Sequence, residues 1–171
     1  VHVVYLEHAD VEELAQVLEA VHHSPLLKAL LNWIDGTVLV LNNQRQILLA
    51  RTSPSSPLGE LSAEEMVGKR LGEAVGCRFA DGGVDGCGTT KSCRFCGALH
   101  AMLDAQRQDR PIDAQCRIDL ARPAGDESVK YRVRASRAGE GEHEFTVIVL
   151  EHLVVVPAGP GTTEHDETPD W

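Results

Sequence analysis

Hydrophobic residues recur at the helical period in several stretches of the chain. In residues 10–22 four apolar positions fall on one face, with acidic residues near the start: Val11, Leu14, Leu18 and Val21. Residues 24–34 repeat the period after a Ser-Pro start, and residues 97–108 repeat it again. A short capped helix is expected at 62–68. The pattern therefore predicts an N-terminal amphipathic helix and three further helices.

From residue 37 onward, short apolar runs of the kind that form strands appear. Residues 38–41 and 47–49 flank a polar turn, which predicts a hairpin. Three more strands are expected at 112–120, 129–136 and 145–150, separated by charged or glycine-containing turns. Five antiparallel strands with helices inserted after the second define an α+β fold class.

A chain of 171 residues has room for one well-buried core and is too short for two ordinary domains. We divide it into an N-terminal helical segment, residues 1–35, and an α+β domain, residues 36–156. Within that domain, residues 72–97 form an insert rich in glycine and cysteine that has no hydrophobic period. Residues 157–171 hold little that could be buried, so we expect a disordered acidic tail.

The charge balance excludes some partners. The formal net charge is -10, and nucleic acids and anionic membranes both require clustered Lys and Arg, so neither is expected to bind. The longest apolar runs are far shorter than the roughly 20 residues that span a bilayer. The first residues also lack the basic end and apolar middle of a signal peptide. A cytoplasmic location is therefore expected.

Four of the five cysteines fall within one short stretch: Cys77, Cys87, Cys93 and Cys96. The last two form a Cys-x-x-Cys pair, which places two thiolates close enough to chelate one metal ion, and the intervening glycines let the other two complete the set. Four soft thiolates suit zinc or an iron-sulfur cluster and exclude calcium and magnesium. Spacing alone does not separate zinc from iron-sulfur. A third reading makes the cysteines redox thiols that form a disulfide on oxidation.

Several neighbouring residues have both a structural and a functional reading. Cys116 lies in a predicted strand, where a buried thiol packed as a small hydrophobe is favoured over a fifth ligand or a resolving cysteine. His100 could reach a metal but is expected to be a partly exposed helix residue. Lys69, Arg70 and Glu73 could orient the site, although solvated charge is the default for such residues. No catalytic motif is present, which argues against an enzyme.

Specific motifs link the chain to a known family. They are Leu39 to Asn42 leading to Arg45 to Ile47, Val67 to Ala74, Gly76-Cys77, Gly86 to Thr90, Cys93 to Ala98, and Cys116 to Ile118. With these motifs the chain resembles the cysteine-rich PAS domains found at the N-terminus of bacterial sensor histidine kinases, over roughly residues 5–150. Arg51 stands where such domains often have Asn, and neither a kinase nor a phospho-accepting helix follows.

The resemblance implies a five-stranded antiparallel sheet flanked by helices and a signal-input role. It also implies a homodimer formed through the N-terminal helix, with a histidine kinase or another signalling effector as partner. Cysteine-bearing PAS domains of other sensors hold oxygen-labile iron-sulfur clusters, which favours iron at this site. The resulting hypothesis is a redox or oxygen sensor. The alternative is a zinc-stapled interaction module without redox chemistry.

Overall fold

The computed structural model describes residues 24–54, 56–58, 61–83, 85–121, 125–139 and 144–157. The amphipathic helix predicted at 10–22 and nearly all of the predicted tail lie outside these ranges. The helices are α2 (Pro25–Trp33), α3 (Ala63–Met66), α4 (Leu71–Val75) and α5 (Gly97–Arg107). The strands are β1 (Thr37–Leu41), β2 (Ile47–Arg51), β3 (Ile112–Leu120), β4 (Glu127–Ala138) and β5 (Phe145–Pro157).

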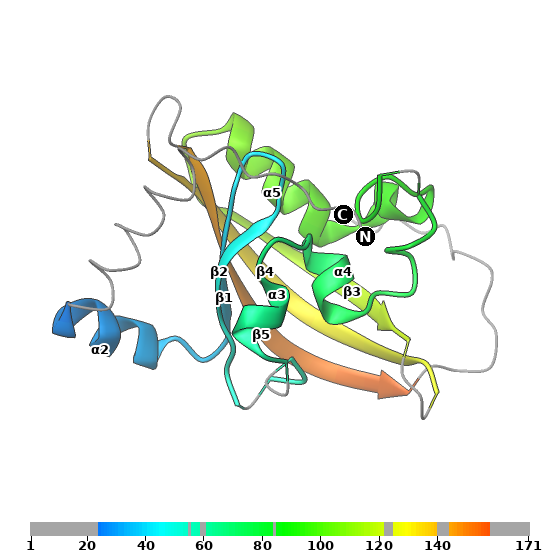
Figure 1. Ribbon diagram of the computed structural model, residues 1–171, viewed down its shortest axis with the longest axis horizontal. Helices are drawn as coiled ribbons and strands as arrows, with labels where there is room; N and C mark the ends of the chain where they lie inside the picture. The colour runs from blue at the N-terminus through cyan, green and yellow to red at the C-terminus, as the bar shows by residue number, and fades with distance from the viewer. Residues whose placement is uncertain are drawn as a thin grey trace.

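The five strands form one antiparallel sheet in the order β2-β1-β5-β4-β3, which confirms the predicted α+β fold. The first strand lies against the last, with Val38 opposite Val149. The helices inserted after β2 lie together on one side of the twisted sheet, with α5 running across β3 and β4 (Figure 1).

Alternation along the strands explains why one face of the sheet is covered. In β4 the side chains of Val129, Tyr131 and Val133 are fully buried beneath the helices. The residues between them point to the other face, where Arg132 and Arg134 are partly exposed or exposed. Because side chains alternate across a strand, a single register places the whole apolar set in the core.

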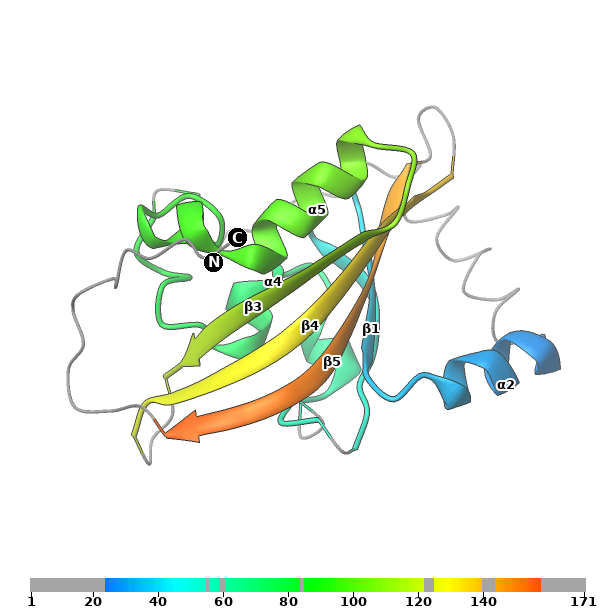
Figure 2. The same cartoon turned by 180° about the vertical axis from the view of Figure 1, so that it is seen from behind.

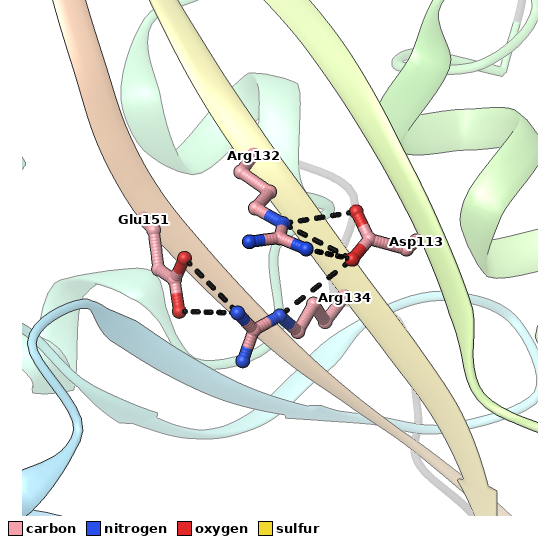
Figure 3. A network of polar contacts seen from close by, with 4 residues as sticks. All are labelled: Asp113, Arg132, Arg134 and Glu151. Atoms are coloured by element: carbon pink, nitrogen blue, oxygen red, sulfur yellow. Dashed lines mark hydrogen bonds and ion pairs between the residues drawn. The ribbon is translucent and has the colours of Figure 1, made fainter.

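Ion pairs connect three strands across the outer face of the sheet (Figure 3). Asp113 on β3 pairs with Arg132 and Arg134 on β4, and Arg134 also reaches Glu151 on β5. Hydrogen bonding to Arg132 lowers the pKa of the Asp113 carboxyl. These side chains are roughly half exposed, so water and salt screen them and they add little to stability.

Helix α2 extends away from the end of the sheet (Figures 1 and 2). Its apolar residues Leu26, Leu30 and Trp33 are 68%, 47% and 84% exposed, respectively. No helix in the described ranges is both long and apolar enough to cross a membrane.

Two stretches differ from the sequence prediction. The segment expected to be irregular between residues 72 and 97 begins inside α4 and contains a 3-10 turn at Ser92–Phe95. Helix α4 is short and holds a glycine, so it shows no hydrophobic period in the sequence. Its first turn is stabilised by Glu73, whose Oε2 accepts a hydrogen bond from the Arg70 N–H at 3.0 Å. Strand β5 is also longer than predicted, because its last residues pair with the start of β4.

Candidate metal centre

Cys77 is held at the end of β3 by the way α4 ends. Gly76 adopts a left-handed conformation, with φ 75°, and closes the helix. The chain then runs antiparallel to β3, with Cys77 opposite Leu120. The N–H of Arg78 donates to Asp119 O at 2.8 Å. The first of the four predicted ligands is therefore fixed to the sheet itself.

Cys87 is fixed by two charged residues at the start of α4. Its N–H donates to Glu73 Oε1 at 3.1 Å, and its carbonyl oxygen accepts from Arg70 Nη1 at 3.1 Å. Gly72 lies against its thiol, since a β-carbon at that position would stand 2.6 Å from Cys87 Sγ and 3.4 Å from Cys77 Cβ. The backbone of α4 therefore forms a cradle for two of the four cysteines.

Cys93 and Cys96 sit at the two ends of one tight turn. The N–H of Cys93 donates to Thr90 O, and the N–H of Cys96 donates to Cys93 O, each at 3.1 Å. Helix α5 begins directly afterwards at Gly97, where a β-carbon would overlap the backbone carbonyl oxygen of Gln115. This glycine therefore allows the start of α5, and with it the Cys-x-x-Cys pair, to approach β3 closely.

The thiols of this region influence one another's pKa. The pKa of the Cys87 thiol is raised to about 11, chiefly by burial and also by charge on Cys93, Cys77 and Cys96, against a backbone hydrogen bond from Gly72. Burial also raises the pKa of Cys77, opposed by a backbone hydrogen bond from Phe79 and reinforced by Cys96 and Cys93.

Cys93 behaves differently from the other thiols. Burial acts to raise its pKa, but hydrogen bonds from the Thr90 hydroxyl and from backbone groups outweigh burial and lower it overall. The positive charge of Arg45 acts in the same direction. The lowered pKa of Cys93 favours the thiolate form, which is what metal ligation requires.

The donor set fits a thiophilic metal in its chemistry. All five cysteines carry free thiols. In the arrangement shown, no three His, Cys, Asp or Glu side chains of the described ranges are close enough to hold one ion, so the sulfurs would have to draw together on binding. Hydrogen bonds aimed at three of the sulfurs favour the thiolate form. These residues can hold zinc or an iron-sulfur cluster.

Cys116 and His100 lie at the edge of this region. Cys116 is 4% exposed and belongs to the main core, and burial raises the pKa of its thiol to about 12, opposed by a backbone hydrogen bond from Ala98. His100 is exposed, and its Nε2 lies 2.6 Å from the carbonyl oxygen of Arg94. That ring nitrogen is therefore committed to the backbone.

One residue of the site was missed by sequence reasoning. Arg45, in the β1–β2 turn, lies beside Cys87 and Cys93, although more than 40 positions separate it from them in the sequence. No local motif indicates this contact. Arg70 and Glu73 are not simply solvated charges, because both hydrogen-bond the backbone of Cys87, whereas Lys69 is exposed.

The fold and the site define a small α+β domain with a cysteine cluster at one end of its sheet. No known family profile matches the chain, and no curated protein is significantly similar to it.

Proposed function

We propose that this chain is a PAS-like signal-input domain that binds a metal centre through Cys77, Cys87, Cys93 and Cys96. The observation that carries the proposal is that the four cysteines lie in one region, around α4 and the start of α5, where a small movement could bring their sulfurs together. They come from three separate pieces of backbone, and each piece is anchored to α4, β3 or α5. This anchoring would hold the four thiols in place for a shared ligand. In this role the protein relays a signal and does not catalyse a reaction.

Two features support a PAS-like domain. The sheet has the five antiparallel strands that the resemblance implies, and the inserted helices all cover one of its faces. The motifs that carry the resemblance include all four cysteines and Cys116. The reducing cytoplasm is the proposed location, because it keeps such thiols free for metal.

An iron-sulfur cluster used for redox or oxygen sensing is the preferred centre. The domain would report the state of the cluster through the segment that carries the ligands, because that segment is tied to the sheet at Cys77 and to the start of α5 at Gly97. Loss of the centre would remove the metal–thiolate links among the four cysteines and shift the balance between two arrangements of the domain. A histidine kinase or another signalling effector would receive the signal.

Zinc is the alternative centre, and the same four thiolates would suit it. In that case the centre would act as a staple for the segment from residue 77 to 96 and would have no redox chemistry. Zinc itself has no redox chemistry, so bound zinc that survives air and peroxide would be the mark of such a staple. The domain would then serve as a protein-interaction module.

Anaerobic purification followed by metal analysis and an absorption spectrum tests the proposal. A brown protein containing iron and sulfide, bleached by air, would support the sensor. A colourless protein with about one equivalent of air-stable zinc would support the staple. A protein that takes up neither metal after reconstitution would refute the metal centre altogether.

We also propose that the domain forms a homodimer. Helix α2 supports this, because three large apolar side chains lie exposed on it: Leu26, Leu30 and Trp33. Such a row usually marks a contact surface. Light scattering on the full chain tests the proposal, and a monomer at all accessible concentrations would refute it.

A further inference from the structure

Arg45 has an unfavourable backbone conformation. With φ 64°, it is the one non-glycine residue with positive φ in the described part of the chain. The turn that contains it is well defined, since the N–H of Arg45 donates to Asn42 O at 2.9 Å and the N–H of Gln46 donates to Asn42 Oδ1 at 2.9 Å. Glycine or asparagine would adopt this conformation at lower cost. An arginine here suggests that its side chain is needed.

The guanidinium of Arg45 reaches across to the cysteine segment. Its Nη2 lies 3.1 Å from the point where a β-carbon of Gly88 would stand, and Gly88 itself has φ 97°. Gly88 directly follows Cys87. The side chain that leaves the β1–β2 turn is therefore seated on the backbone between two of the proposed ligands, and a glycine makes the room for it.

A second guanidinium lies on the same segment. Arg70 Nη1 donates to the carbonyl oxygens of Asp85 at 2.6 Å and Cys87 at 3.1 Å, and its Nε donates to Gln44 O at 3.2 Å. Arg70 thus links Gln44, the residue before Arg45 in the β1–β2 turn, to the cysteine segment. Two positive charges converge on the loop around Cys87.

Placing these charges together is unfavourable without a counter-charge. Burial and the charge of Arg70 both lower the pKa of Arg45, and charge on Cys87 and Cys93 opposes this shift. Two cations that share a partly buried position need anions nearby. The Glu73 carboxylate, hydrogen-bonded to the same Cys87 backbone, is one nearby anion, and four thiolates around a divalent metal, which retain net negative charge, would supply the second.

We propose that Arg45 is the counter-charge of the four-cysteine centre and a positioning residue for its Cys87 and Cys93 side. Arg45 thereby ties the centre to the β1–β2 hairpin. The inference rests on the proposed metal site and adds the residue that balances its charge. It accounts for the strained turn and for the lack of a side chain at Gly88.

Two substitutions separate this role from a purely structural one. Arg45→Gly removes the charge and also relieves the backbone strain, whereas Arg45→Lys keeps the charge. Arg134→Gln, on the outer face of the sheet, is the control for the loss of one positive charge. Zinc alone is the probe, with affinity measured by competition with a chromophoric chelator, and urea unfolding of the reduced, metal-free protein is measured in parallel.

We expect Arg45→Gly to bind zinc at least tenfold more weakly, while its metal-free form unfolds at the same or a higher urea concentration than the wild type. Arg45→Lys should recover most of the zinc affinity, and Arg134→Gln should match the wild type. Equal zinc affinity in Arg45→Gly and wild type would overturn the inference and leave the metal site standing. A metal-free form of Arg45→Gly that is itself less stable would also overturn it. If the wild type takes up neither zinc nor an iron-sulfur cluster after reconstitution, both proposals fail.

Discussion

The backbone of Gly72 faces the sulfur of Cys87 so closely that a β-carbon on Gly72 would stand 2.6 Å from Sγ. Gly72 lies inside α4, where glycine is otherwise unfavourable. Its presence there is explained by the thiol that it accommodates. The glycine and the cysteine are 15 positions apart in the sequence and act as one feature of the site.

Gly72→Ala should therefore weaken metal binding more than it changes folding. Helix propensity alone would stabilise α4 by about 1 kcal/mol. The clash can be relieved by rotating the Cys87 side chain, so the net change in the free energy of unfolding should stay within about 1 kcal/mol. The rotated sulfur would no longer point toward the other thiols, and we expect at least a tenfold loss of zinc affinity.

Gly82→Ala is the matched control for that substitution. Gly82 lies in the same glycine-rich stretch, and a β-carbon there would meet Thr90 Cγ2 at an ordinary 3.5 Å. Zinc titration and urea unfolding should show Gly82→Ala to be close to wild type. If both variants bind zinc equally well, the cradle at Gly72 has no role in the site.

Replacing the five cysteines one at a time should divide them into two classes. A serine substitution at any of the four proposed ligands should remove most of the bound metal, because a closed four-ligand site does not tolerate a missing thiolate. These ligands are Cys77, Cys87, Cys93 and Cys96. Cys116→Ala should retain full metal content, because Cys116 packs in the main core. Metal analysis after anaerobic reconstitution measures the difference. Loss of metal in Cys116→Ala would identify a fifth ligand.

The buried thiol of Cys116 predicts a loss of stability at alkaline pH in the reduced, metal-free protein. Folding raises its pKa from 9.0 to about 12, because burial disfavours the thiolate. The folded state thus retains a proton that the unfolded state releases, so stability is full below about pH 9 and falls as the pH rises toward 12. The loss in the free energy of unfolding that comes from this one group should reach about 2 kcal/mol near pH 10.5.

Urea unfolding at about pH 8 and about pH 10.5 measures this effect. In Cys116→Ala the difference between the two pH values should shrink by roughly that amount, about 2 kcal/mol. Because other groups titrate in the same range, the effect of Cys116 is taken from the difference between the wild type and Cys116→Ala. An equal pH dependence in both would show that Cys116 does not keep its proton on folding.

Glu73→Gln tests the link between α4 and the cysteine segment. The carboxylate accepts from two backbone N–H groups, of Arg70 at 3.0 Å and of Cys87 at 3.1 Å. An amide has only one oxygen and would turn its NH2 group toward the other donor. We expect a loss of about 1 kcal/mol in the free energy of unfolding and weaker zinc binding. Glu65→Gln, on an exposed position of α3, should leave both quantities unchanged.

Much of the fold could be predicted because its elements are long and strongly periodic. Strand β3, at Ile112–Leu120, was predicted to the residue, and α5 ends within one position of its prediction. Helix α4 could not be predicted, because five residues including a glycine show no period. The end of β5 was missed because its pairing with the start of β4 is a tertiary effect that apolar runs do not report.

The candidate site could be predicted only in part. The spacing of the four cysteines was enough to predict them as metal ligands, since chelation by a Cys-x-x-Cys pair depends only on residues close together in the sequence. The roles of Gly72 and Arg45 depend on contacts across the fold, and neither a glycine in a helix nor an arginine in a polar turn indicates a metal site by itself. The role of Gly97 also depends on such a contact, because the backbone carbonyl that it touches belongs to Gln115, 18 positions further along the chain.

Gly97→Ala is consequently expected to be more damaging than Gly72→Ala. The obstacle at Gly97 is a backbone carbonyl of β3, which cannot rotate away as a cysteine side chain can. Helix α5 would have to move off the sheet at its first turn, and the Cys-x-x-Cys pair would move with it. We expect a loss of about 2–4 kcal/mol in the free energy of unfolding, because both the packing of α5 and the hydrogen bonds at its start are affected. Urea unfolding of the metal-free protein measures this loss, with Gly82→Ala as the control. Wild-type stability in Gly97→Ala would show that α5 does not need its close contact with β3, and the cysteine pair would then have to be anchored by different contacts.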